Sequence, residues 1–562
     1  MTIHPPATPA SRRLRELAPL ACPALFALVP ILSIAARNPG QFRYVDLATI
    51  LLVAALGAVV ITLLVLALVR LLVRDPRTTP LAILGTLLVV AWWFGYVPVQ
   101  AAVTKAAPAL GQHRVLAPLG LLATIAVATW CLRQPAGRLA AMSGFLGRFA
   151  VFLVAILGLQ TVVADARGPR AARHSILARQ LAAPVPVHPG PSITANNPPR
   201  DIYVIVLDGH ANARVLRQVF GYDNSAFEDS LRALGFLVPA DVRSNYVQTY
   251  LSVASLLNAA HVTPLTRDAG VASKDHTLPT YLVKQNRTVR FLKAHGYRYL
   301  LFPSAWWAAT ANSPLADEEF DASPGFALLH EITRTELRLA VIRSSLARYV
   351  VGAKEDQAPM VEHFLRSFDG LARVPADPAP TFAFAHFLIP HIPYLLDAAC
   401  RPLAHQIGDD MEADTPEQRA DYVGQVRCAD RLVLRLVTAL LRGSSPAPVI
   451  IVVGDHGSRF ADVGFYDHPE RVSRAFVRER FGAFGAFYLP AGGRREFREP
   501  VTLVNVLGNV LRYYFGASLP RSPDSMYVSG LELYRFFPVD PRILASAGGQ
   551  AAGSKARAES TP

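Results

Sequence analysis

The sequence predicts an α/β fold with a mostly parallel central sheet between helices, preceded by a membrane region of about five helices. Of 562 residues, 52% are hydrophobic, and the apolar excess lies before about residue 165, which indicates a membrane part followed by a water-soluble part. Two short apolar runs, "DIYVIVLDG" and "APVIIVVGDHG", are typical of strands buried on both faces. Between them, stretches such as Gln425–Leu441 carry apolar residues at helical spacing.

The N-terminal region contains five apolar stretches. Three arginines, at positions 12, 13 and 15, precede the first stretch, and further arginines follow the second and the fourth, which favours a cytoplasmic N-terminus. An odd number of spans then leaves everything after about residue 165 outside the cytoplasm, and one miscounted span would reverse this side. A spanning helix needs roughly 20 mostly apolar residues, so we expect spans near 17–36, 47–69, 80–103, 115–132 and 149–164.

The remaining chain divides by composition into three parts. Residues 166–200 are rich in Pro and Arg, as in an extended linker. Residues 201–540 form the predicted α/β domain, and residues 541–562 have few large apolar side chains and are expected to be disordered. The net charge of +14 indicates an Arg-rich surface near lipid headgroups. Because the chain has no nucleic-acid motif, we expect no nucleic-acid partner.

Acidic side chains follow both apolar runs. Asp208 ends the first run, and Asp455 with His456 ends the second. Sites in parallel sheets lie beyond the carboxyl ends of the strands, so these side chains should meet there. Two carboxylates and one imidazole suit a divalent metal, zinc or manganese, and leave a position open for a hydroxyl or a substrate oxygen. A strand-end Asp can instead cap the following helix.

Four motifs in this order resemble the alkaline phosphatase superfamily: "YVIVLDGHA", "NYVQTYLSVAS", "FLIPHIPY" and "VVGDHGSRFADVGFYDH". The chain is most similar to the sulfatase-like membrane enzymes, which include bacterial phosphoethanolamine transferases and lipoteichoic acid synthases. These enzymes also carry about five N-terminal spans before an outer catalytic domain. The resemblance implies a multi-pass protein of the bacterial inner (plasma) membrane with an extracytoplasmic, sulfatase-like α/β domain.

The resemblance also implies roles for individual residues. The Thr-x-x-Ser-Val pattern of these enzymes falls on "TYLSV", which makes Thr249 the implied nucleophile and metal ligand beside Asp208, Asp455 and His456. A metal stabilises the alkoxide of a bound hydroxyl, which is otherwise a poor nucleophile. The same resemblance implies that two histidines hold the anionic group or the leaving group of the substrate, namely His391 and His468.

Several neighbouring side chains have less defined roles. Asn245 is a candidate for binding an oxyanion, and Arg459, just past "DHGS", is a candidate for clamping an anionic group. Ser252 lies one helical turn after Thr249, where packing or positioning is the expected role. His386, in an apolar run, is expected to be an ordinary core histidine. Two cysteines outside the spans, Cys400 and Cys428, are either bridged or buried as free thiols.

The predicted function is transfer or hydrolysis of a phosphodiester or related anionic ester on an envelope lipid or glycan. One alternative is a sulfate-ester hydrolase. Its formylglycine motif would fit "SVASL" only up to Leu256, which stands where that motif has Arg. A second alternative is an inactive relative that binds the envelope. The expected partners are the lipid bilayer and a lipid-linked or glycan substrate.

Overall fold

The chain forms two compact units, Met1–Ala166 with Phe326–Asp356 and Arg167–Gly325 with Gln357–Pro562. We call them the helical unit and the α/β unit. The computed structural model describes residues 21–38, 42, 44–73, 75–188, 199–304, 310–320, 336–350, 353–376, 379–403, 414–462 and 464–545.

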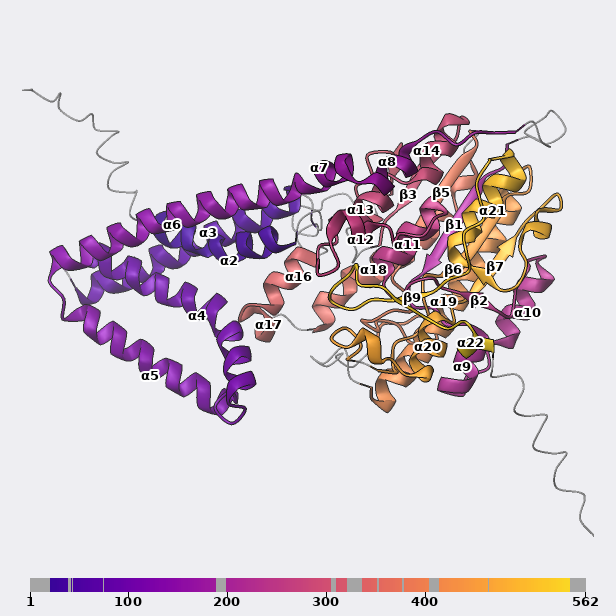
Figure 1. Ribbon diagram of the computed structural model, residues 1–562. Coiled ribbons are helices and arrows are strands. Elements are labelled where there is room, and N and C mark those ends of the chain that lie inside the picture. Colours follow the sequence, from indigo (N-terminus) through magenta and orange to yellow (C-terminus); the bar gives the residue numbers. More distant parts are fainter. Residues whose placement is uncertain are drawn as a thin grey trace, which may run out of the picture. The chain divides into compact units, whose positions relative to one another are not determined.

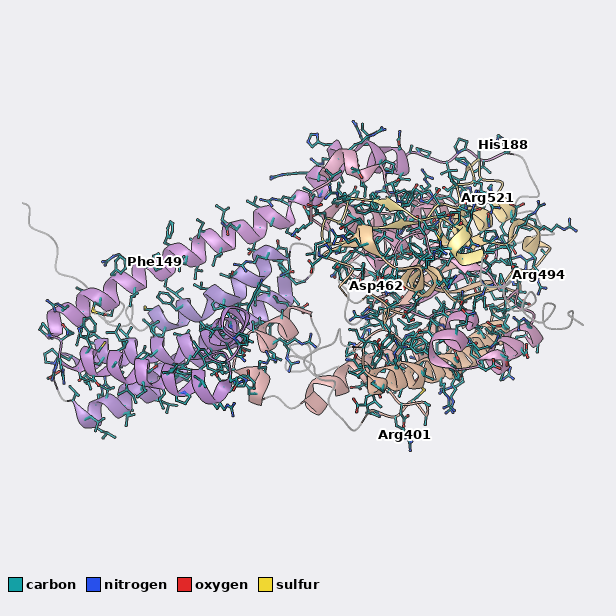
Figure 2. The ribbon with its side chains drawn as sticks, turned by 60° about the horizontal axis from the view of Figure 1, so that its bottom comes forward. Phe149, His188, Arg401, Asp462, Arg494 and Arg521 are labelled. Carbon is teal, nitrogen blue, oxygen red and sulfur yellow. A yellow bond between two sulfur atoms is a disulfide. The ribbon has the colours of Figure 1, made fainter. Side chains whose placement is uncertain are left out.

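The helical unit confirms the predicted N-terminal region of apolar helices (Figure 1). Four described helices are long and apolar enough to cross a membrane, whereas the first has only 17 residues. Large apolar side chains such as Phe149 stay exposed on these helices (Figure 2), as expected where helices face lipid. The last of these helices begins at Ala136, well before the expected start at residue 149. Its two arginines, Arg138 and Arg148, can lay their apolar stems along the helix while their guanidinium groups reach water. The helices are α2 (Ala21–Arg37), α3 (Tyr44–Leu72), α4 (Thr78–Ala106), α5 (His113–Leu132) and α6 (Ala136–Asp165).

A short segment from far along the sequence completes the helical unit. It forms α16 (Glu336–Arg343) and α17 (Ala347–Val350). The Leu337 side chain is buried in one cluster with residues of α2 and α3. The backbone N–H of Leu346 donates a 2.8 Å hydrogen bond to the Trp93 carbonyl on α4. The sequence carries no signal for this insertion into 201–540, because local periodicity does not reveal which unit a short helix packs against.

The predicted extended linker is wrong over its first part, which is helical. α7 (Arg167–His174) and α8 (Ile176–Ala182) pack apolar side chains into the core of the α/β unit. Ser175 caps α8 by accepting a 3.0 Å hydrogen bond from the Ala178 N–H, and its hydroxyl donates to Asp268. Tertiary burial therefore outweighs the Pro and Arg content. Residues 189–198 and the tail from 546 onward lie outside the described residues, and α22 (Arg542–Ala545) precedes that tail.

The α/β unit is built on a six-stranded sheet in the order β4-β3-β5-β1-β6-β7, which confirms the mostly parallel sheet. Central β1 pairs in parallel with β5 and β6, and only β7, at the edge, is antiparallel within this sheet. All residues of β1 and β6 are buried, as expected of strands covered on both faces. The strands are β1 (Ile202–Leu207), β3 (Arg298–Phe302), β4 (Glu318–Glu319), β5 (Thr381–Phe387), β6 (Val449–Gly454) and β7 (Gly485–Tyr488).

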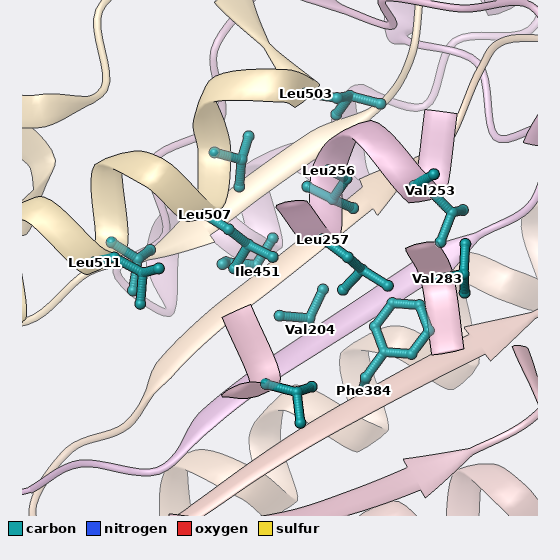
Figure 3. Close-up of a cluster of buried hydrophobic side chains, with 14 of the residues drawn as sticks. Val204, Val253, Leu256, Leu257, Val283, Phe384, Ile451, Leu503, Leu507 and Leu511 are labelled. Carbon is teal, nitrogen blue, oxygen red and sulfur yellow. The ribbon is translucent and has the colours of Figure 1, made fainter. Parts of the chain in front are cut away.

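Helices cover both faces of the sheet. On one face, leucines and valines of α11 (Thr249–Asn258) and α21 (Leu503–Phe515) pack over Val204 of β1 and Ile451 of β6 (Figure 3). α13 (Thr277–Lys284) and α14 (Arg287–Ala294) complete this layer. The other face is covered by α10 (Ser225–Ala233), α18 (Ala353–Leu371) and α19 (Pro416–Gly443). Smaller elements are β2 (Val242–Arg243), β8 (Val501–Thr502), β9 (Tyr527–Val528), β10 (Phe537–Pro538), α9 (Ala213–Phe220), α12 (Leu265–Ala269) and α20 (Arg474–Phe481).

The open question about the cysteines is answered by a disulfide. Cys400, in the loop after β5, is bonded to Cys428 on α19. The bond closes a segment with a sequence separation of 28 residues. The loop that contains His391 is therefore tied covalently to the helix layer beneath it.

Candidate functional site

Two neighbouring parallel strands bring their terminal carboxylates together. Leu207 of β1 and Gly454 of β6 are register partners, so Asp208 and Asp455 leave the sheet side by side. Ligand atoms of Asp208, Asp455 and His456 all lie within 4.8 Å of one another. All three side chains are buried. We call these three residues the carboxylate cluster.

The turn after β6 fixes the orientation of Asp455. Its Oδ1 accepts hydrogen bonds from the backbone N–H groups of Gly209 (3.0 Å) and His456 (2.9 Å). Its Oδ2 is left 3.3 Å from His456 Nε2. The approach of the two chains requires glycine, because a Cβ on Gly454 would lie 2.3 Å from the His210 carbonyl oxygen. One oxygen of Asp455 is therefore used by the fold, and the other faces the cluster.

His456 presents a nitrogen lone pair to the same point. Its Nδ1 donates a 2.9 Å hydrogen bond to the Gly457 carbonyl oxygen, and since a carbonyl only accepts, the proton belongs on Nδ1. Nε2 then carries the lone pair, 3.7 Å from Asp208 Oδ1 and 3.2 Å from Thr249 Oγ1. A metal-ligating histidine needs this tautomer, and a metal at Nε2 would replace the 3.1 Å hydrogen bond that Nε2 accepts from Arg480 Nη2.

The electrostatics of the cluster favour a cation. Burial raises the pKa of Asp208 and of Asp455, and the neighbouring charge of Asp208 raises the pKa of Asp455 further. Burial also holds the pKa of His456 well below its usual range, so its imidazole is neutral. Asp208 Oδ1 is buried and accepts no hydrogen bond from the residues that the structure describes. A divalent ion between these groups would offset both carboxylates, so the donor set fits a metal.

Thr249 stands at the cluster as the first residue of α11. The residue before it, Gln248, is anchored by its side-chain amide, which donates to the carbonyl oxygens of Ser529 (2.9 Å) and Gly530 (3.0 Å). Thr249 is half-buried, and its hydroxyl points at His456 Nε2. Burial raises the pKa of Asp455, and the Thr249 hydroxyl lies close enough to this carboxyl to oppose that shift. The structure therefore gathers Thr249 with the carboxylate cluster, and its role as nucleophile stays a prediction.

Two of the predicted substrate-binding residues lie beside the cluster. The His391 ring centroid is 6.4 Å from that of His456, and its Nδ1 donates a 2.6 Å hydrogen bond to the Ile392 carbonyl. Burial raises the pKa of Asp208 and lowers the pKa of His391, and the nearby charge of Arg459 opposes the first shift and adds to the second. The loop that contains Arg459 is held by the buried Glu479 carboxylate. This carboxylate accepts hydrogen bonds from the Ser458 hydroxyl and from the backbone N–H groups of Phe460 and Ala461.

The other two are placed differently. The His468 side chain is 64% exposed and lies 3.7 Å from Glu470, so it is not among the residues gathered at the cluster. The Asn245 amide is buried, donates to the Ser525 carbonyl (2.8 Å) and accepts from the Val504 N–H (2.8 Å). Asn245 therefore braces two backbone segments, and this geometry does not support a role in oxyanion binding.

Two residues beside the cluster were not expected from the sequence. Arg480 on α20 is buried, and its Nη2 donates a 3.1 Å hydrogen bond to His456 Nε2. In a chain with 56 Lys and Arg residues, one arginine inside a helix gives no signal. His386 on β5 lies with its Nε2 3.4 Å from Asp208 Oδ2. The position of His386 near Asp208 follows from its pairing with Val206 in the register of β1 and β5. That pairing can be recognised only once the order of the strands is known.

Residues 230–476 match the family model described as Sulfatase. This part of the chain is therefore similar to the Sulfatase family, and the α/β unit has a sulfatase-like fold. No curated protein matches the sequence.

The solved structures to which this chain is similar are distant. The C-terminal periplasmic domain of EptC from Escherichia coli, a complex with Zn, aligns at 14% identity with a TM-score of 0.41, over 64% of this chain and 96% of that one. The corresponding domain of phosphoethanolamine transferase EptC from Campylobacter jejuni aligns at 12% identity and TM-score 0.34, over 57% and 92%. The soluble domain of lipooligosaccharide phosphoethanolamine transferase A from Neisseria meningitidis aligns at 12% and 0.33, over 59% and 91%.

Proposed function

We propose that the protein is a membrane-anchored, metal-dependent enzyme that transfers or hydrolyses a phosphodiester or related anionic ester through Thr249. One observation carries the proposal: the Thr249 hydroxyl lies 3.2 Å from His456 Nε2, at the carboxylate cluster and at the N-terminus of a helix. A hydroxyl, an imidazole lone pair and two carboxylates converge there. A core polar network would not need two buried carboxylates side by side.

Asp208, Asp455, His456 and Thr249 are the residues that would hold the metal. Two carboxylates, one neutral imidazole and a hydroxyl suit zinc or manganese. When bound, such an ion lowers the pKa of a coordinated hydroxyl and offsets negative charge on the group being transferred.

The chain's own residues then perform the following steps. Thr249 Oγ1 attacks the phosphorus of the ester, its bond to phosphorus forms, and the bond to the leaving oxygen breaks. The proton that Thr249 releases passes to His391 Nε2, because the Nδ1 proton of His391 is held by the Ile392 carbonyl, and the imidazolium then donates that proton to the leaving oxygen. Arg459 and Arg480 offset charge on the non-bridging oxygens, together with the free N–H groups at the start of α11. A second alcohol or water then attacks the threonine ester and releases Thr249.

The membrane anchor suggests the substrate class. A domain held near a bilayer meets lipid-linked donors and envelope glycans, and the arginine bias around the spans favours an extracytoplasmic position for it. We place the protein in a bacterial inner membrane. Reporter fusions at Pro199 test this placement, because they should be active only outside the cytoplasm, and activity in the cytoplasm contradicts both the topology and the envelope substrate.

A covalent adduct tests the reaction. The purified full-length protein is incubated with zinc or manganese and a synthetic aryl phosphodiester, quenched, digested and examined by mass spectrometry. The transferred group should appear on the peptide that contains Thr249, and the Thr249→Ala protein should show none. A sulfate-ester hydrolase would instead cleave an aryl sulfate and carry an aldehyde-bearing residue at position 252. Absence of turnover and of bound metal under all conditions would indicate an inactive, envelope-binding relative.

A further inference from the structure

A pocket inside the helical unit has no role in the proposed reaction. Its volume is about 540 Å³, within the range of about 300–1,000 Å³ typical of ligand sites. It is lined by α2, α4, α5 and α6, through residues such as Phe26, Leu88, Trp130 and Met142, and no charged side chain lines it. Water in such a pocket would have few hydrogen-bond partners, so an apolar occupant fits it better.

The helices around the pocket converge at one end of the unit. There the Arg77 side chain, at the start of α4, donates a 3.1 Å hydrogen bond to the Leu132 carbonyl at the end of α5. Farther along, the Trp92 Nε1 donates a 2.6 Å hydrogen bond to Thr124 Oγ1, so α4 and α5 are also bridged on the way to the connection between them (Figure 1). Along α5 only Cys131 is buried, so this helix leaves one side of the pocket open toward the surroundings of the unit.

The length of the pocket matches one leaflet of a bilayer. Its lining on α4 runs from Leu84 to Gly95, which is roughly 16 Å at the helical rise. Half of the hydrocarbon core of a bilayer is about 15 Å. An extended acyl chain that enters from one leaflet therefore has room along the whole pocket.

Basic side chains lie at the convergent end. Arg138 is exposed and stands one turn before Met142 on the same face of α6, and Met142 lines the pocket. Arg133 is exposed in the connection between α5 and α6. A phosphate group at this end would meet guanidinium groups while its acyl chain lies among apolar side chains.

We propose that this pocket binds one acyl chain of a membrane phospholipid with an anionic headgroup, whose phosphate is held by Arg138 and Arg133. The proposal concerns the helical unit alone, so it stands or fails independently of the reaction at Thr249.

The test measures binding of defined lipids to the full-length protein. Delipidated protein in detergent is titrated with dioleoyl phosphatidylglycerol and, separately, with dioleoyl phosphatidylcholine, and native mass spectrometry counts the bound molecules. One phosphatidylglycerol should bind saturably and more tightly than phosphatidylcholine. Equal affinity for the two lipids, or binding of detergent alone, contradicts the proposal.

Three substitutions locate the binding. Ala91→Trp fills the pocket from an exposed position and should weaken phosphatidylglycerol binding roughly tenfold. Gly95→Leu is a second filling variant, because a Cβ at Gly95 meets no atom within 4 Å. The matched control is Leu122→Trp, on a side chain of α5 that is 62% exposed and outside the pocket, and it should leave binding unchanged.

Arg138→Gln separates the headgroup from the chain. It should reduce the preference for phosphatidylglycerol over phosphatidylcholine and leave phosphatidylcholine binding as it is in the unaltered protein. Unchanged phosphatidylglycerol binding in both filling variants would show that the lipid lies elsewhere and would overturn the proposal.

Discussion

The ends of β6 and β1 carry the same kind of side chain and hold it in different ways. At the end of β6, Asp455 Oδ1 accepts two backbone hydrogen bonds, and the Ser252 hydroxyl donates a 2.6 Å hydrogen bond to the Asp455 carbonyl. At the end of β1, none of the described residues donates a hydrogen bond to Asp208 Oδ1. Its other oxygen lies 3.4 Å from His386. Each carboxylate therefore keeps one buried oxygen without a hydrogen bond from the described residues, Asp455 Oδ2 and Asp208 Oδ1, and only Asp455 has its other oxygen fixed by two backbone N–H groups.

The difference teaches how such a site can be both stable and reactive. A fully satisfied pair of buried carboxylates would have no need for a metal, whereas two unsatisfied ones would destabilise the fold. Here two backbone hydrogen bonds hold Asp455 Oδ1 in place, while Asp455 Oδ2 and Asp208 Oδ1 remain as the oxygens that a metal could satisfy. Thr249 lies at this point, and the predictions below test whether the two ends act on its hydroxyl as proposed.

The largest expected effect is on Thr249 itself. Thr249→Ala should lower kcat by about a thousandfold or more, since loss of a nucleophile removes the covalent route. Metal content should remain, because the carboxylate cluster is intact. Thr249→Ser should keep part of the activity, since its hydroxyl survives. The control is Thr438→Ala, because the Thr438 hydroxyl on α19 donates to the Leu434 carbonyl of the same helix. Normal turnover by Thr249→Ala would refute the assignment.

The next effect concerns a third strand end, that of β5. The disulfide between Cys400 and Cys428 closes the segment after His391, and its removal by Cys400→Ser with Cys428→Ser should destabilise the α/β unit by about 3–4 kcal/mol in the chain-entropy account. The measurement is the thermal midpoint with and without reductant. Identical midpoints for the double variant and the unaltered protein would mean that the bond does not constrain this end.

The comparison of the two carboxylates predicts a difference between Asp455→Ala and Asp208→Ala. Both should lose the metal, because too few ligands remain. In the metal-free state, Asp455→Ala leaves the N–H groups of Gly209 and His456 unpaired and should cost about 1–3 kcal/mol. Asp208→Ala removes a carboxylate whose Oδ1 is unsatisfied and should cost less or nothing. Metal analysis measures the loss of the ion, and the thermal midpoints of the two variants after treatment with a chelator measure the difference in stability. Equal destabilisation by the two substitutions would remove the distinction.

The site residues that directly follow a strand could be predicted from the sequence. Asp208, Asp455 and His456 follow apolar runs directly, so the parallel-sheet rule alone places them at one edge, and the structure gathers them there. Thr249 could be proposed only from the resemblance, because the six hydroxyl side chains in "SNYVQTYLSVAS" look equivalent locally. In the structure, Thr249 differs from Ser252 because it begins α11 and its hydroxyl lies at His456 Nε2, whereas the Ser252 hydroxyl donates to the Asp455 carbonyl.

The parts that could not be predicted depend on contacts between distant segments. Arg480 reaches His456 from α20, and His386 reaches Asp208 across two paired strands, so neither contact leaves a local pattern. The bracing contacts of Asn245 could not be predicted for the same reason, because its partners, Ser525 and Val504, are about 260–280 residues away. The helical α7 and α8 show that composition can mislead where burial decides the conformation.

The smallest expected effect is that of Ser252→Ala. The Ser252 hydroxyl braces the β6 end through the Asp455 carbonyl and lies one turn from Thr249, so its loss should shift the cluster slightly. We expect a destabilisation of about 1 kcal/mol and a fall in turnover of only a few-fold. Ser255→Ala is the matched control, because it makes the same change on α11 and removes a 2.9 Å hydrogen bond to the Ala260 carbonyl, away from β6. The two variants should lose similar stability, and only Ser252→Ala should lose turnover and metal affinity. Equal turnover in the two would show that Ser252 is merely structural, and a transferred group found on Ser252 would make it, and not Thr249, the nucleophile.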